Sequence, residues 1–199
     1  MVTDLKIEDF KNTSSGDRGR KKIHPHKFTL WVGLGSIIMM FAGLTSAFIV
    51  KRSQAGWQDI EAPSIFIYST LVILISSVTV QMAVRAHKQR EMPKYRLFIT
   101  VTAFLGSLFV AMQFFGFKTM WAGGVTFRSS ISGSFLFVIL GLHALHVIGG
   151  VITLLIMFFK AFSRKVRTYS SVGIEVAATY WHFVDLLWLY LVIFFIVIK

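Results

Sequence analysis

The sequence contains no cysteine and only three prolines, and charged residues make up 15% of its 199 positions. Without cysteine the chain has no disulfide, no thiolate metal site and no cysteine nucleophile. Soluble domains carry about 25% charged residues, whereas here 55% of the residues are hydrophobic and the mean hydropathy is +0.67. This composition excludes a soluble enzyme. It also leaves no room for a long linker or a second soluble domain.

Five apolar stretches are long enough to cross a membrane. A bilayer core about 30 Å thick requires roughly 20 residues of helix. The stretches cover residues 28–50, 64–84, 97–117, 132–159 and 174–198. We therefore predict an all-α integral membrane bundle of five transmembrane helices in residues 28–199, preceded by a polar tail in residues 1–27.

The basic residues follow the predicted topology. The chain has 21 lysines and arginines against nine acids, a net charge of +12. Residues 1–27, 85–96 and 160–167 hold 16 of the 21, and all three segments lie on one side of a five-span bundle. Positive residues are typically enriched in cytoplasmic segments and can contact anionic lipid. We therefore predict a cytoplasmic N-terminus, an external C-terminus and no nucleic-acid partner.

Ionisable side chains inside a bilayer cost free energy and usually have a function. Five fall in the predicted spans: His143 and His146 in the fourth, and Glu175, His182 and Asp185 in the fifth. Residues three apart lie about 60° apart around a helix, so the two histidines of the fourth span share a face. His182 and Asp185 also share a face, and Glu175 extends it. Because the two helices run antiparallel, the histidine pair and Asp185 reach about the same depth.

These residues are open to three interpretations. In the first, they form a structural clamp in which the imidazoles of one helix hydrogen bond to the carboxylate or the backbone of a neighbour, so that each buried polar group satisfies another. The preferred pairing joins His143 or His146 to Asp185. In the second, His143 or His146 binds a haem together with His182, because two neighbouring histidines on one helix cannot occupy both sides of a haem. In the third, Glu175 and Asp185, about 15 Å apart along the helix axis, belong to a proton relay.

The sequence contains no catalytic motif. It has no phosphate-binding loop, no nucleophile elbow and no HExxH zinc motif, and it lacks the Glu-x-x-His repeats of a di-iron bundle. We therefore predict no catalytic, metal-binding or cofactor-binding residue in this chain. Trp181, Asp185 and Trp188 lie within about 60° of one another on a helical projection. Such a face is too polar and too bulky to contact lipid tails alone.

Two ten-residue segments resemble the signatures of one family. Residues 141–150, GLHALHVIGG, resemble the GLHxLHVxxG signature of haem-copper oxidase subunit III, and residues 180–189, YWHFVDLLWL, resemble the YWHFVDxxWL signature that follows it in that family. They have the right order and separation, and both fall on predicted membrane helices. The candidate residues of the structural clamp and the family motifs are His143, His146, Glu175, Tyr180, Trp181, His182, Asp185 and Trp188.

Weaker similarity extends over all five predicted helices. Residues 31–43 resemble the family's W-L-F-x-x-S-E-V-M-F-F-A-G helix, residues 69–79 resemble its NT…SSxT helix, and residues 105–113 fit its LGxxFxxxQ stretch. The chain resembles the five-helix form of the family, which lacks the first two of seven helices and is typical of bacteria and archaea. One departure is that the family glutamate after serine, the favoured candidate for a proton-related role, aligns with Ile37.

The resemblance implies an accessory subunit without a redox centre of its own. In such oxidases the haems and coppers lie in subunits I and II, while subunit III packs on subunit I near a proton-uptake channel, binds phospholipids between its helices and preserves activity over many turnovers. The implied complex lies in a bacterial or archaeal plasma membrane, belongs to aerobic electron transport, reduces dioxygen to water and pumps protons. Two alternatives are a subunit III-like component of a nitric oxide reductase and an independent membrane haem protein.

Overall fold

The structure is a computed structural model, and it describes residues 25–53, 57, 65–126, 130–163 and 171–198. Most of the predicted polar tail therefore lies outside the described residues. Within these ranges the chain forms the helices α2 (Pro25–Arg52), α3 (Ile65–Lys88), α4 (Met92–Ala122), α5 (Ile131–Phe162) and α6 (Val172–Val197). All five are long and apolar enough to cross a membrane. This finding confirms the predicted all-α bundle of five spans.

The helices extend beyond the apolar stretches that predicted them. The third span was expected at residues 97–117, whereas α4 has 31 residues and runs from Met92 to Ala122. Because α3 also continues to Lys88, only residues 89–91 connect these two helices. A helix does not have to end where its apolar side chains end, since lysine and arginine can extend toward the membrane surface from a helix that continues. Arg90, with a φ of 60°, turns the chain between them.

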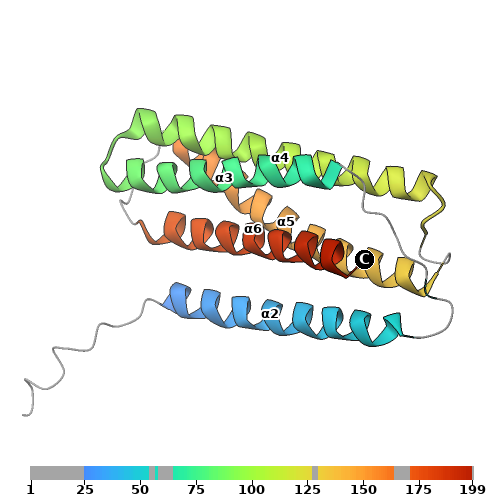
Figure 1. The fold of residues 1–199 in the computed structure, drawn as a ribbon. Helices are drawn as coiled ribbons and strands as arrows, with labels where there is room; N and C mark the ends of the chain where they lie inside the picture. The colour runs from blue at the N-terminus through green and yellow to red at the C-terminus, as the bar shows by residue number, and fades with distance from the viewer. Residues whose placement is uncertain (1–24, 54–56, 58–64, 127–129, 164–170, 199) are drawn as a thin grey trace, which may run out of the picture.

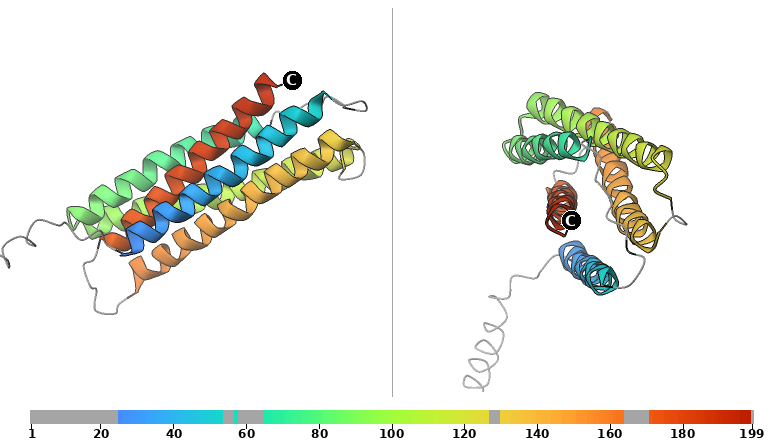
Figure 2. Two further views of the ribbon diagram at one scale, coloured as in Figure 1. Left: turned by 90° about the horizontal axis from the view of Figure 1, so that it is seen from below. Right: turned by 45° about the vertical axis from the view of Figure 1, so that its right-hand side comes forward.

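Helix α6 lies between α2 and α3 and also packs against α5. Figure 1 shows α3, α6 and α2 side by side, with α5 behind α6. The right-hand view of Figure 2 shows the same order, with α4 and α5 on the other side. In backbone contacts, α6 packs against α2, α3 and α5, and α4 packs against α3 and α5. Among the described residues the backbone of α2 comes close to those of α5 and α6 but not to that of α3.

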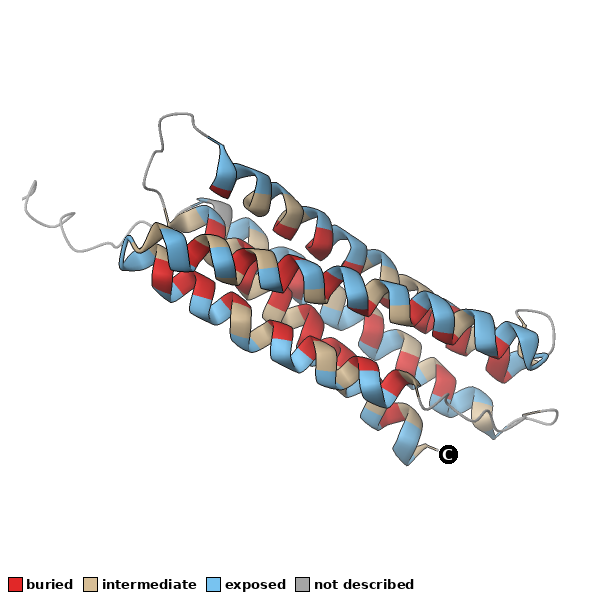
Figure 3. Ribbon diagram, turned by 90° about the horizontal axis from the view of Figure 1, so that it is seen from above, coloured by how far each residue is buried: buried red, intermediate tan, exposed pale blue. Residues whose placement is uncertain are grey.

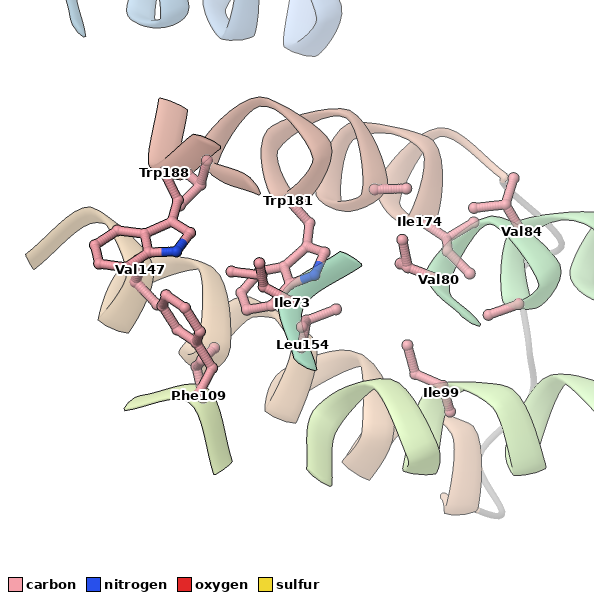
Figure 4. Packing of buried hydrophobic residues seen from close by; sticks show 14 of the residues in the cluster. Ile73, Val80, Val84, Ile99, Phe109, Val147, Leu154, Ile174, Trp181 and Trp188 are labelled. Carbon is pink, nitrogen blue, oxygen red and sulfur yellow. The ribbon is translucent and has the colours of Figure 1, made fainter. Parts of the chain in front are cut away.

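Buried apolar side chains form two clusters. The larger one joins α3, α4, α5 and α6 and contains Trp181 and Trp188. Figure 4 shows these two indoles projecting from α6 toward Val147, Ile73 and Leu154. The smaller cluster joins α2 to α5 and α6, and its buried members are Phe41, Phe48, Ile139, Leu187, Leu191 and Phe194. In Figure 3 the buried residues form stripes along the inner sides of the helices.

The outer surface of the bundle is apolar. Large hydrophobic side chains stay exposed on every helix, and five of them are each 66% exposed: Trp31, Phe104, Phe114, Leu145 and Leu186. A water-soluble monomer rarely exposes contiguous apolar surface on this scale. The surface is therefore suited to lipid tails or to other membrane helices.

Candidate functional site: the signature residues of α5 and α6

Trp181 occupies a slot that two glycines leave open. Its side chain is fully buried, and a Cβ added to Gly106 of α4 or to Gly150 of α5 would lie 2.9 Å from its ring atoms. The absence of a side chain at both positions thus allows three helices to approach one indole. The indole N–H of Trp181 donates to Oγ of Ser76 in α3 at 3.1 Å. One residue of α6 therefore contacts all three of its neighbours in the larger cluster.

Two more side chains of α6 are hydrogen bonded to α3. The indole N–H of Trp188 donates to Oγ1 of Thr70 at 3.0 Å. Nδ1 of His182 lies 2.6 Å from Oγ of Ser77, and its Nε2 lies 3.3 Å from Oε1 of Gln81. Buried or half-buried polar groups of the family signature are thus satisfied by hydroxyl and amide groups of another helix, as polar groups in a membrane require.

The signature of α5 also contacts α6. His143 is buried, and its ring stacks on Trp188 with the ring centroids 5.1 Å apart. His146 does not reach across to α6 with its ring, because its Nδ1 hydrogen bonds to the carbonyl oxygen of Leu142 in its own helix at 2.7 Å. Instead, the hydroxyl of Tyr180 donates to the carbonyl oxygen of His146 at 3.0 Å. The link between α5 and α6 at this level is therefore made through the backbone of the histidine.

The expected hydrogen bond between Asp185 and the histidine pair is not present. Asp185 is buried as predicted, but neither of its carboxyl oxygens and neither ring nitrogen of His143 has a hydrogen-bond partner among the described residues. The prediction was wrong on this pairing because equal depth does not ensure contact: His143 faces Trp188, and His146 is bonded within its own helix.

Glu175 joins three helices at one end of the bundle. Its two carboxylate oxygens accept from Nζ of Lys27 in α2 at 2.7 Å and from Nζ of Lys88 in α3 at 2.9 Å. Nearby at this end, Nε of Arg96 donates to the carbonyl oxygen of Ala161, which links α4 to the end of α5. Glu175 is thus an ion-pair partner. One turn further along α6, the hydroxyl of Thr179 donates to the backbone carbonyl oxygen of Glu175.

Helix α2 is attached through few polar contacts. Apart from Lys27, the hydroxyl of Thr45 lies 2.9 Å from the hydroxyl of Tyr190 in α6. Ile37, which aligns with the family glutamate, packs against the smaller apolar cluster. The position of that glutamate therefore lies on the side of α2 that faces the bundle, and here it contributes apolar packing.

The histidines face different neighbours, which matters for the haem alternative. His182 is bonded to α3, whereas His143 and His146 lie against Phe41 of α2, with ring centroids 6.5 and 6.0 Å away. A search of the described ranges finds no group of three His, Asp or Glu side chains that could hold a metal ion. The arrangement therefore gives no support to a histidine pair that would sandwich a haem.

The two signatures lie on neighbouring, contacting helices of a five-span bundle, and a comparison with known families identifies them. Residues 27–198 match the family described as cytochrome c oxidase subunit III. The chain belongs to this family. As a subunit III, it is an accessory subunit of a haem-copper oxidase that forms a complex with other oxidase subunits. Members of the family lack redox cofactors of their own.

Several bacterial relatives carry the same name. A probable cytochrome c oxidase subunit 3 of Mycobacterium leprae is 33% identical over 171 residues, which cover 83% of this chain and 85% of the relative. The subunit 3 of Corynebacterium diphtheriae is 29% identical, with 83% and 85% covered. That of Bacillus subtilis is 29% identical, with 81% and 80% covered. These relatives and the five apolar helices make this subunit III a multi-pass protein of a bacterial plasma membrane.

The sequence indicated the signature residues of this subunit III but not the residues on other helices that hydrogen bond to them or pack against them. Ser76, Ser77 and Thr70 were recognised only as part of a weaker family match, and Gly106 only as a member of another. A signal was available, because hydroxyl residues recur at positions 70, 76 and 77 of an otherwise apolar helix. These positions spread over about 120° around α3, so they mark a broad polar side of the helix but do not say which helix that side contacts.

Proposed function

We propose that this chain supports subunit I of the oxidase as a structural scaffold, and that its signature residues maintain its fold instead of taking part in redox chemistry. One observation carries the proposal: the indole and imidazole groups of the α6 signature are used in contacts between helices. Trp181 and Trp188 donate to hydroxyls of α3, and His182 contacts the same helix. Groups that are already bonded within the chain are poorly placed to bind a reactant.

The proposal assigns the cofactors to other subunits. The haems and coppers would lie in subunits I and II, with subunit I in direct contact with this chain. The histidines of α5 and α6 face aromatic, hydroxyl and amide neighbours that supply no second metal ligand. Elemental analysis of the purified chain should find less than one iron or copper per molecule. One equivalent of either metal would contradict this assignment.

The proposal also includes the orientation and the surrounding lipid. The ends of the helices that carry Lys27, Lys88 and Arg96 would face the cytoplasm, which is the side that anionic lipids favour for basic residues. Phospholipids would cover the apolar outer surface, including the exposed Trp31 and Leu145. A reporter that works only in the cytoplasm should be active when fused before residue 1 and inactive when fused after residue 199. Activity in both positions would contradict a five-span topology.

The scaffold role can be tested by removing one acceptor. Ser76→Ala leaves the buried Trp181 N–H without its partner, whereas Ser107→Ala removes an exposed hydroxyl that bonds only within α4. Interhelical hydrogen bonds in membranes average about 0.6 kcal/mol and reach about 1.7. Oxidase that carries Ser76→Ala should lose subunit III more readily in detergent and inactivate after fewer turnovers, with unchanged haem spectra. Equal behaviour of the two variants would contradict the proposed role of the signature.

A further inference from the structure

One outer face of the bundle is built from three helices in a row. Helices α3, α6 and α2 stand side by side, and the described backbones of α2 and α3 do not come close to each other (Figures 1 and 2). A strip of α6 is therefore left exposed between its two neighbours. Glu175 marks the start of this strip, because it reaches Lys27 on one side and Lys88 on the other. We call this surface the α3–α6–α2 face.

Two apolar residues continue the strip along α6. At 100° per residue, Leu186 and Ile193 both lie within about 20° of Glu175 around the helix. They are 66% and 56% exposed, respectively. The strip is bounded on the α3 side by His182, which bonds to α3, and on the α2 side by Tyr190, which bonds to Thr45. The centre of the face is thus an exposed apolar ridge with polar groups along its border.

The polar group that distinguishes this face is Gln81. The five helices contain two glutamines, Gln81 in α3 and Gln113 in α4, and their surroundings differ. Gln113 is buried, and its amide nitrogen donates to Ser69. Gln81 is exposed on α3, and its Oε1 faces Nε2 of His182. An exposed amide inside a membrane span is unusual, because lipid tails offer it no hydrogen-bond partner.

The donors of this amide can be counted. When the neutral His182 ring donates from Nε2 to Oε1 of Gln81, its Nδ1 accepts from the Ser77 hydroxyl. The two N–H donors of the Gln81 amide then remain, and no described residue accepts from them. Gln81 lies seven residues from Lys88, which corresponds to about 10 Å deeper along the helix axis. The donors are therefore displaced from the charged end of the bundle toward its apolar middle.

We infer that the α3–α6–α2 face is the surface on which a transmembrane helix of oxidase subunit I docks, with a hydrogen-bond acceptor of that helix opposite the Gln81 amide. This inference rests on the proposed scaffold function and specifies its contact surface. The exposed ridge of Leu186 and Ile193 supplies apolar packing, and the amide supplies the polar contact that fixes depth and rotation. Lipid tails could cover the ridge, but they would leave both amide donors unpaired.

Among the described residues, the exposed middles of α4 and α5 lack this combination. The exposed middle of α4 carries apolar residues such as Phe104 and Leu108, and its Ser107 hydroxyl is bonded to the carbonyl oxygen of Ala103. The exposed middle of α5 carries Leu145 and Ile148. These surfaces suit lipid tails, and they provide matched controls for the test.

Cross-linking in the intact oxidase tests the docking face directly, since the chain has no cysteine of its own. Leu186→Cys and Phe104→Cys place one thiol on the proposed face and one on α4, at equally exposed positions. Each variant is labelled with a thiol-reactive photo-cross-linker in its native membrane, and the linked peptide is identified by mass spectrometry. We expect Leu186→Cys to link to a transmembrane segment of subunit I and Phe104→Cys to link to lipid. Lipid adducts alone at Leu186→Cys, or a subunit I adduct at Phe104→Cys, would overturn the inference.

A second variant tests the amide itself. Gln81→Met keeps a side chain of similar length on the surface and removes both donors, and it also removes the Oε1 that faces Nε2 of His182 at 3.3 Å. Retention of subunit III in detergent-purified oxidase should fall by about threefold, the factor that corresponds to one interhelical hydrogen bond of about 0.6 kcal/mol. The thermal unfolding temperature of the isolated chain should fall only slightly, because His182 keeps its contact with Ser77. Unchanged retention would overturn the role of Gln81.

The two proposals fail in different ways. If the scaffold role of the signature is wrong, Ser76→Ala has no effect while the cross-link at Leu186→Cys still forms to subunit I. If the docking face is wrong, Ser76→Ala loosens the subunit while the cross-link at Leu186→Cys forms only to lipid.

Discussion

Helices α6 and α2 are attached to the same bundle in different ways. The signature of α6 contacts its neighbours through hydrogen bonds and through Trp181, which fits between two glycines. Helix α2 has glycines too, but a Cβ added at Gly33, Gly35 or Gly43 would meet nothing within 4 Å. In a membrane, apolar contact alone gives little preference for protein over lipid. The comparison suggests that close packing and hydrogen bonds position α6, whereas α2 relies on a few contacts along its length.

The largest expected effect comes from filling the slot around Trp181. Gly150→Ala places a methyl group 2.9 Å from the ring of a fully buried tryptophan, and that ring cannot move away because Gly106 lies equally close on the other helix. Overpacking of this kind costs about 1–3 kcal/mol. The thermal unfolding temperature of the subunit should fall, and subunit III should be depleted in purified oxidase.

The adjacent glycine provides the control for this prediction. Gly149→Ala meets only the Tyr180 hydroxyl at 3.8 Å, which is ordinary contact, and Gly35→Ala meets nothing. Both variants should unfold at or slightly above the temperature of the natural chain, since alanine favours a helix over glycine by about 0.5–1 kcal/mol. If all three substitutions behave alike, close packing does not distinguish α6 from α2.

A smaller effect is expected at the charged end, where α2 and α3 both pair with Glu175. Glu175→Gln removes the charge partner of Lys27 and of Lys88 and leaves two ammonium groups near each other. Partly exposed ion pairs contribute about 0.2–1 kcal/mol each, and salt screens them. The loss of stability should be largest at low ionic strength and should shrink as salt is added. A loss that does not depend on salt would show that Glu175 acts through something other than these pairs.

The smallest effect is expected at the hydroxyl contact of α2. Thr45→Val keeps the shape of the side chain and removes the contact with Tyr190. The expected loss in the free energy of unfolding is about 0.6 kcal/mol. It should be detected as faster proteolysis of α2 or as a faster reaction of α2 with added cross-linking reagents. Thr153→Val is the control, because that hydroxyl bonds only to a carbonyl of its own helix. A cost at Thr45→Val as large as that of Gly150→Ala would contradict the proposed difference between the helices.

The sequence was sufficient for the number of spans and for the buried face of α6. A hydropathy pattern detects lengths of apolar helix, and helical spacing placed Trp181, Asp185 and Trp188 on one face that the structure buries. The extra turns of α4 were missed because charged residues interrupt the hydropathy without ending the helix.

The partners across helices could not be predicted from spacing. Equal depth suggested that His143 or His146 bonds to Asp185, but depth says nothing about rotation, and it is rotation that directs His143 to Trp188 and His182 to α3. The slot around Trp181 is likewise invisible in the sequence, because glycines at positions 106 and 150 are brought together only by the packing of α4 against α5.

The central claim is that the signature residues maintain the fold of this subunit and perform no chemistry. Asp185→Asn tests it most directly, since asparagine has nearly the same size but does not ionise. The decisive measurement is the rate of the first turnover of oxygen reduction by the purified oxidase, expressed per copy of subunit III retained in the complex. We predict that this rate and the haem spectrum do not change. A complex that retains subunit III fully but fails to reduce oxygen at the first turnover would contradict the account.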